Sequence, residues 1–202
     1  KIDGAAITAP RYQIDAESLQ IHDLPATFIL ETEVEIAPQD NTSLEGLYKA
    51  GGIFCTQCEA QGFRKITYFP DRPDVMTHFT TTIVGDASRY PVMLSNGNPV
   101  ESGKTPDGRS WITWRDPFKK PSYLFALVAG DLQVIEDKFQ TKSGRDILLQ
   151  IFVEEENITK CDHAMLSLKQ AMKWDEETFG LEYDLDIYMI VAVNDFNMGA
   201  ME

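Results

Sequence analysis

Only one long stretch of this 202-residue sequence repeats its apolar side chains at helical spacing, and it lies between residues 157 and 180. Such a repeat predicts an α-helix with one buried face, and Glu176 falls on the outward face. Asn157 or Thr159 can cap the start of this helix, and Gly180 can end it. The buried stripe is expected to consist of Met165, Leu168, Ala171 and Met172. The remaining ordered structure must therefore come mainly from strands.

Residues 1–131 have the pattern of an antiparallel β structure. Short runs rich in β-branched and aromatic residues alternate with turn residues about every 8–12 positions. Asn96-Gly97 is the strongest kind of short hairpin signal, and Asp107-Gly108 predicts a second tight turn. Strands are expected at residues 26–36, 65–69, 79–84, 110–114 and 123–128.

The pattern changes near residue 131. Further strands are expected at residues 132–139, 147–153 and 186–193, with the helix between the last two. The last of these runs is continuously apolar, which is typical of a strand inside a sheet. We therefore expect a mainly β fold with a smaller α+β part, divided into an N-terminal β domain at residues 1–131 and a second domain at residues 132–202.

Composition narrows the classes of partner. The chain carries 18 basic and 32 acidic side chains, which gives a net charge of -14. Nucleic acids and anionic membrane surfaces are bound by clustered Lys and Arg, so this charge disfavours both. The sequence contains no run of about 18 apolar residues, so it predicts no membrane span. We therefore expect a protein that binds neither nucleic acid nor membrane.

The three cysteines are Cys55, Cys58 and Cys161. A small odd number favours reduced thiols and a cytoplasmic location. Cys55 and Cys58 have CxxC spacing, but a zinc ribbon would need a second pair. A redox site would need a thiol of low pKa at a helix start, whereas the flanks here predict strand and loop. Two ordinary thiols are the preferred interpretation, and a redox protein is the alternative.

The C-terminal residues carry a possible binding function. The apolar strand leads into Met198, Gly199, Ala200, Met201 and Glu202. Small residues allow another backbone to approach closely, and an edge strand can bind an extended peptide as one more strand. A carboxylate at position 202 would then lie near the end of that peptide. Taken by itself, this pattern also fits an ordinary sheet edge.

Several motifs occur in order and together resemble one family. Residues 198–202 resemble the Gly-Ala-Met-Glu-Asn motif of zinc aminopeptidases, without its Asn. Residues 57–64 (Gln-Cys-Glu-Ala-Gln-Gly-Phe-Arg) resemble a motif of the same family's N-terminal domain. Further matches are residues 68–75, 94–98, 123–131 and 172–176. The chain thus resembles zinc metallo-aminopeptidases of the gluzincin type, most closely the bacterial aminopeptidase N group.

This resemblance implies a saddle-like antiparallel β domain followed by the start of a thermolysin-like catalytic domain. It also implies roles for individual residues. Glu59 and Glu202 would bind the free α-amino group of a peptide substrate, and Gln57 and Met198 would line the pocket for its first side chain. Gly199 and Ala200 would offer backbone groups to the peptide.

The resemblance implies Zn²⁺ in the full-length protein, bound by an HExxH motif and a further Glu. His22, His78 and His163 do not fit that motif, so we assign no metal ligand and no catalytic residue within this chain. The chain would therefore bind no zinc alone and would need the remainder of the catalytic domain as its partner. The alternative is a non-catalytic β-rich binding module.

The isolated 202-residue chain should not hydrolyse aminoacyl-anilide substrates, even with excess zinc, because no two of its histidines have ligand spacing. The measurement is release of the aniline by rigorously purified chain with and without added zinc. Zinc-dependent turnover that an aminopeptidase inhibitor abolishes would show that the chain holds a complete active site.

Overall fold

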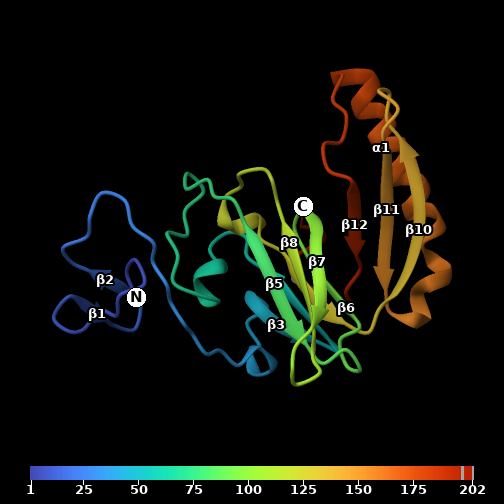
Figure 1. Cartoon of the computed structure of the whole chain (residues 1–202). Coiled ribbons are helices and arrows are strands. Elements are labelled where there is room, and N and C mark those ends of the chain that lie inside the picture. The colour runs from blue at the N-terminus through green and yellow to red at the C-terminus, as the bar shows by residue number, and fades with distance from the viewer. Residues whose placement is uncertain (197, 202) are drawn as a thin grey trace.

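The computed structural model of the chain describes residues 1–196 and 198–201 (Figure 1). It is a mainly β protein with one long helix, α1 (Asp162–Phe179). The strands are β1 (Tyr12–Ile14), β2 (Leu19–Ile21), β3 (Gly46–Ala50), β4 (Ile53–Gln57), β5 (Thr80–Gly85), β6 (Val92–Ser95), β7 (Asn98–Lys104), β8 (Ser110–Arg115), β9 (Leu127–Gly130), β10 (Gln133–Gln140), β11 (Asp146–Val153) and β12 (Ile187–Val191). Short 3-10 helices cover Pro38–Asp40, Phe63–Lys65, Ser122–Leu124 and Glu155–Lys160.

Two antiparallel sheets form the centre of the molecule. One has the order β3-β4-β9-β6 and the other the order β5-β8-β7. The β1–β2 hairpin lies at one end of the molecule, and α1 with its sheet lies at the opposite end (Figure 1). The expectation of a mainly β fold is confirmed, and none of the described helices is both long and apolar enough to cross a membrane.

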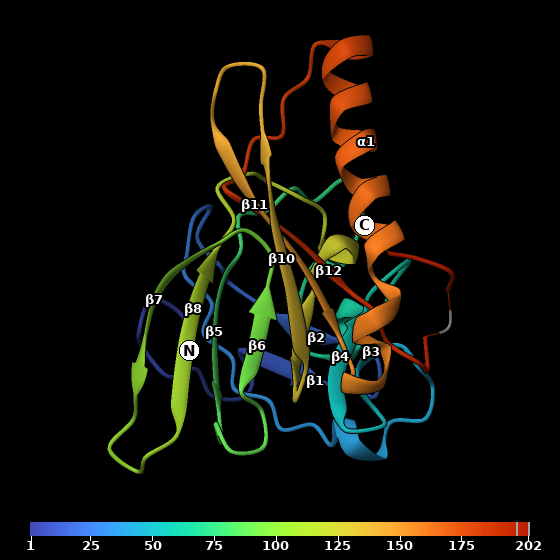
Figure 2. The ribbon, with the colours of Figure 1, turned by 90° about the vertical axis from the view of Figure 1, so that its right-hand side faces the viewer.

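The second part of the chain folds as strand, strand, helix, strand, as the sequence predicts. β11 pairs with β10 antiparallel and with β12 parallel. Helix α1 runs along this sheet (Figure 2). It buries Met165, Leu168 and Met172 in one cluster with Ile147 and Leu149 of β11. The prediction that β12 lies inside a sheet is wrong for the described residues, since β12 pairs there with β11 alone and forms an edge.

Three details of the helix differ from the prediction. Neither Asn157 nor Thr159 caps α1, because both lie in the preceding 3-10 helix, and the position before α1 is Cys161. Ala171 is exposed rather than part of the stripe. Glu176 is buried rather than outward-facing, and its carboxylate accepts the backbone N–H of Lys142 in the β10–β11 turn at 3.1 Å. The stop at Gly180 is confirmed by its left-handed conformation.

The predicted strand at residues 26–36 is wrong. Only Leu30 forms a bridge, with Ile2, and Val34 and Ile36 remain exposed. Alternation of apolar and charged residues predicts which side chains share a face, but a strand also needs a partner backbone. Residues 65–69 are likewise no strand, since Lys65 ends a 3-10 helix, and the strand expected at 123–128 starts only at Leu127.

The Asn96-Gly97 turn does not make a hairpin. β6 before the turn pairs with β9, and β7 after it pairs with β8, so the turn carries the chain from one sheet to the other. Gly97 has φ +87°, and a Cβ there would lie 2.2 Å from the carbonyl oxygen of Arg115. The Asp107-Gly108 turn does join a hairpin, between β7 and β8, as predicted.

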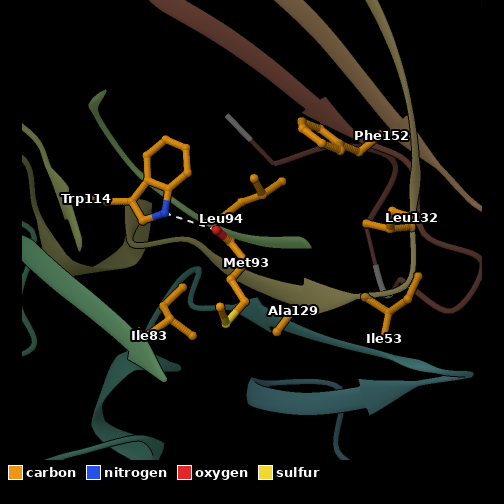
Figure 3. Packing of buried hydrophobic residues seen from close by; sticks show 8 residues of the cluster. All are labelled: Ile53, Ile83, Met93, Leu94, Trp114, Ala129, Leu132 and Phe152. Carbon is orange, nitrogen blue, oxygen red and sulfur yellow. Dashed lines mark hydrogen bonds between the residues drawn. The ribbon is translucent and has the colours of Figure 1, made fainter. Parts of the chain in front are cut away.

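One apolar core connects the two parts of the chain (Figure 3). Leu132 and Phe152 pack in the same buried cluster as Ile53 of β4. Trp114 closes this cluster on the side of the second sheet, and its indole N–H donates to the carbonyl of Met93 at 3.1 Å. The predicted domain boundary at residue 131 therefore stays a prediction, with continuous packing across it.

Replacing Gly97 by alanine should destabilise the chain far more than replacing Gly108. Both residues have φ +87°, but a Cβ at Gly108 meets no atom within 4 Å. Gly108→Ala should cost about 1–2 kcal/mol for the left-handed backbone. Gly97→Ala should cost more than about 4 kcal/mol, because the Arg115 backbone must also move.

The measurement is the free energy of unfolding of both variants in urea. Equal losses would mean that the close approach of Gly97 to Arg115 is not a real constraint on this turn.

Candidate functional site

Gln57 is the residue around which the site is organised. It ends β4, its backbone pairs with Gly46 of β3, and its side chain is 0% exposed. Its Oε1 accepts the backbone N–H of Glu59 at 2.8 Å. This bond fixes the amide so that Nε2 points to the sulfur of Met198, which it contacts. A buried amide with both ends engaged has one well-defined orientation.

The turn after β4 presents Glu59 to solvent. The N–H of Gly62 donates to the carbonyl of Cys58 at 2.8 Å and closes the turn. A Cβ on Gly62 would lie 2.5 Å from the carbonyl oxygen of Gln57, so only glycine fits there. The peptide between Glu59 and Ala60 is cis. Glu59 itself is exposed, next to the buried Gln57.

Asp71 anchors the far side of this turn. Its carboxylate is buried and accepts the backbone N–H of Arg64 at 3.0 Å and the Arg64 side-chain Nε–H at 3.2 Å. The other carboxylate oxygen accepts the hydroxyl of Ser122 at 2.5 Å. A carboxylate with several donors of this kind holds its neighbours rigidly. The segment that carries Glu59 is thereby fixed to the loop before β9.

The segment after β12 reaches the end of β4. Phe196 packs against the buried cluster of Tyr48, Ala50 and Cys55, and the Tyr48 hydroxyl donates to the carbonyl of Asp195 at 3.2 Å. Met198 then meets Gln57.

Of the residues expected to bind a peptide, Gln57 and Met198 are in contact, and Glu59 lies two positions beyond Gln57 in the turn. Gly199 and Ala200 are exposed on the segment that follows. Glu202 lies outside the described residues.

Cys55 and Cys58 do not form a redox site. Both are buried free thiols. Burial raises the pKa of Cys55, and burial together with the nearby charge of Asp71 raises the pKa of Cys58 to about 12. A redox cysteine needs a lowered pKa, so the redox alternative is wrong. The preferred interpretation of two structural thiols fits these positions.

The described residues do not form a metal site. Within residues 1–196 and 198–201, no group of three or more His, Cys, Asp or Glu could hold a metal ion. His22, His78 and His163 are each exposed, the first two in loops and the third on α1. The donor set that zinc needs is therefore not supplied by this part of the chain. The groups that this arrangement exposes are the Glu59 carboxylate and the Met198 thioether, and the Gln57 amide is buried behind them.

Comparison with known proteins identifies the class. Residues 9–124 match the Peptidase M1 N-terminal domain, and residues 163–202 match the Peptidase family M1 domain. The chain therefore belongs to the M1 family of peptidases. This membership confirms the resemblance to metallo-aminopeptidases and favours it over a separate binding module.

The individual relatives that this chain matches are named as aminopeptidases. The chain is 59% identical to aminopeptidase N of Caulobacter vibrioides over 201 residues, covering 100% of this chain and 23% of the relative. It is also 59% identical to Escherichia coli aminopeptidase N, covering 92% of this chain and 21% of the relative. A solved structure of Legionella pneumophila aminopeptidase A in complex with aspartic acid superposes with a TM-score of 0.89 at 37% identity, covering 98% of this chain and 23% of the other. The chain thus spans less than a quarter of the length of these relatives.

Sequence reasoning missed the supporting residues of the site. Asp71 and Arg64 lie in stretches that carry the family resemblance, but the spacing of seven residues does not reveal their contact. Tyr48 and Asp195 are 147 positions apart, and neither stands in a motif. Only the fold brings them together.

The Cys58 thiol should be unreactive in the folded chain. With a pKa of about 12, only about one thiol in 10,000 is ionised at pH 8. A variant that retains Cys58 alone, with Cys55→Ala and Cys161→Ala, should react with a disulfide reagent at pH 8 only after addition of urea. Complete reaction of the folded variant within minutes would contradict this.

The same raised pKa gives a pH dependence of stability. The unfolded thiol ionises near its ordinary pKa of about 8.5, whereas the folded thiol stays protonated. The contribution of Cys58 is therefore fully present below that pH and is lost as the pH rises toward the folded value. It is measured as the pH dependence of the unfolding free energy relative to Cys58→Ala.

Proposed function

We propose that this chain supplies part of the substrate-binding site of a zinc aminopeptidase. Such an enzyme removes the N-terminal residue from peptides that have a free α-amino group. The observation that carries the proposal is the contact between Gln57 and Met198. It joins the end of β4 to the segment after β12, across the two parts of the chain. The family membership and the names of the relatives support the same activity for the whole protein.

Glu59 and Glu202 are proposed to bind the α-ammonium group of the substrate. An exopeptidase must locate the peptide bond that follows the first residue of its substrate. A fixed carboxylate can recognise the free amino end by charge-assisted hydrogen bonds. Glu59 suits this role because it is exposed while its own backbone N–H is held by the buried Gln57. The turn is thus rigid, but the carboxylate is available to a ligand.

Gln57 and Met198 are proposed to line the pocket for the first side chain of the substrate. A thioether is unbranched and polarizable, so Met198 can adjust to side chains of different size. Gly199 and Ala200 would offer their backbone groups to the peptide, which can lie as an added strand. Their small side chains leave room for this close approach.

Zinc would be held by the remainder of the catalytic domain, since the described residues offer no ligand set. Bound there, zinc would polarise the scissile carbonyl and activate water. The complex of the Legionella relative with aspartic acid is consistent with recognition of a free amine, because a free amino acid carries an α-ammonium group. The three free thiols support a cytoplasmic location for the whole protein.

Glu59→Gln in the full-length protein should lower kcat/KM for aminoacyl substrates. The substitution keeps the shape and removes the charge. One charged hydrogen bond is worth about 1.5–3 kcal/mol, so the expected loss is about 10- to 150-fold. N-acetylated peptides should be poor substrates for the unmutated protein.

Glu101→Gln is the matched control, since Glu101 is an exposed glutamate on β7 far along the chain from the site. It should leave kcat/KM unchanged. The amine-binding role fails if Glu59→Gln behaves like the control, or if N-acetylated peptides are cleaved as readily as free ones.

A further inference from the structure

Among the described residues, the segment that leads from β12 to Met198 is held mainly by side-chain contacts. β12 ends at Val191, and the last ladder-type bond after it runs from the N–H of Ala192 to the carbonyl of Phe152. Beyond that point the Asn194 side-chain amide donates to the Glu154 carboxylate, and the Tyr48 hydroxyl donates to the carbonyl of Asp195. The position of Met198 relative to Gln57 therefore depends on side chains from other elements.

Tyr48 is placed to connect both halves of the site. It lies on β3 opposite Cys55 of β4, two positions from the pair formed by Gly46 and Gln57. Its side chain is 0% exposed, and its hydroxyl donates to the carbonyl of Asp195 at 3.2 Å. The same residue is thus fixed to the strand that carries Gln57 and bonded to the segment that carries Met198.

The surroundings of Tyr48 favour a persistent bond. Phe196 and Val128 pack against the cluster of Tyr48, Ala50 and Cys55, so the ring has little freedom. Burial raises the pKa of Tyr48, which keeps the hydroxyl protonated and able to donate. A buried Tyr hydroxyl normally finds such a partner, and loss of the bond would leave the Asp195 carbonyl to solvent.

We propose that Tyr48 is a positioning residue for substrate recognition, which sets the distance between the segment at Met198 and the end of β4 through its bond to the Asp195 carbonyl. This inference rests on the proposed function. Tyr48 does not touch the substrate. It acts on affinity by holding Met198 against Gln57, and a loosened segment would bind the free substrate and the transition state less well to a similar extent.

The test is Tyr48→Phe, which removes one hydroxyl and keeps the ring. In the full-length protein KM for free-amine aminoacyl-anilides should rise by about 2- to 12-fold, the range expected for one neutral hydrogen bond, with kcat nearly unchanged. The matched control is Tyr183→Phe. Tyr183 is half-buried, and like Tyr48 it has a raised pKa and a hydroxyl that donates to a backbone carbonyl, that of Ile187 at 3.1 Å, but this bond spans only four residues.

Tyr183→Phe should leave KM unchanged while affecting stability to a comparable degree. A KM for Tyr48→Phe equal to that of the control would overturn the positioning role. A second readout is amide hydrogen exchange in the full-length protein. The amides of residues 195, 196 and 198–201 should exchange at least about twofold faster in Tyr48→Phe than in Tyr183→Phe.

The two readouts separate the proposals. If the unmutated full-length protein fails to prefer free amines, the proposed function is wrong, and the exchange comparison alone decides whether Tyr48 holds the segment. If free amines are preferred but exchange and KM are the same in both variants, the proposed function stands and the inference about Tyr48 is wrong.

Discussion

Burial of Leu132 and Phe152 against Ile53 is the interaction on which the rest of this structure depends. These side chains come from the two parts of the chain and lie in one core with Trp114 (Figure 3). Burial of apolar surface is the main favourable term in folding, and close packing leaves little freedom for the sheets to move. The end of β4 and the segment after β12 therefore meet in one arrangement.

Polar contacts fix the turn after β4 and the segment at Met198 relative to the apolar core. Asp71 fixes the turn after β4 through Arg64 and Ser122, and Gln57 uses both ends of its amide to hold Glu59 on one side and Met198 on the other. Asp71, Ser122 and Gln57 are buried and bonded, as buried polar groups must be. The result is a rigid frame that presents the exposed carboxylate of Glu59.

Local signals predicted the parts of the fold that depend on neighbouring residues. The Asp107-Gly108 hairpin, the strands on either side of residues 142–145 and the stop at Gly180 follow from turn and cap chemistry. The strand at residues 26–36 was wrong because alternation does not supply a partner, and the Asn96-Gly97 turn joins two sheets instead of two paired strands. The residues expected to bind substrate came from family resemblance, whereas the bond from Tyr48 to Asp195 depends on tertiary packing that no local pattern encodes.

The separation of Gln57 and Met198 also determines when the site can exist. They are 141 positions apart, so β4 and its turn leave the ribosome long before their partner segment. At about 5–20 residues per second, the delay is roughly 7–28 seconds. During synthesis the β-rich part can therefore fold before its contact with Met198 exists, and the proposed recognition site would be complete only after β12 (Ile187–Val191) has joined the sheet. A nascent chain would accordingly lack the proposed recognition site until its second part is made.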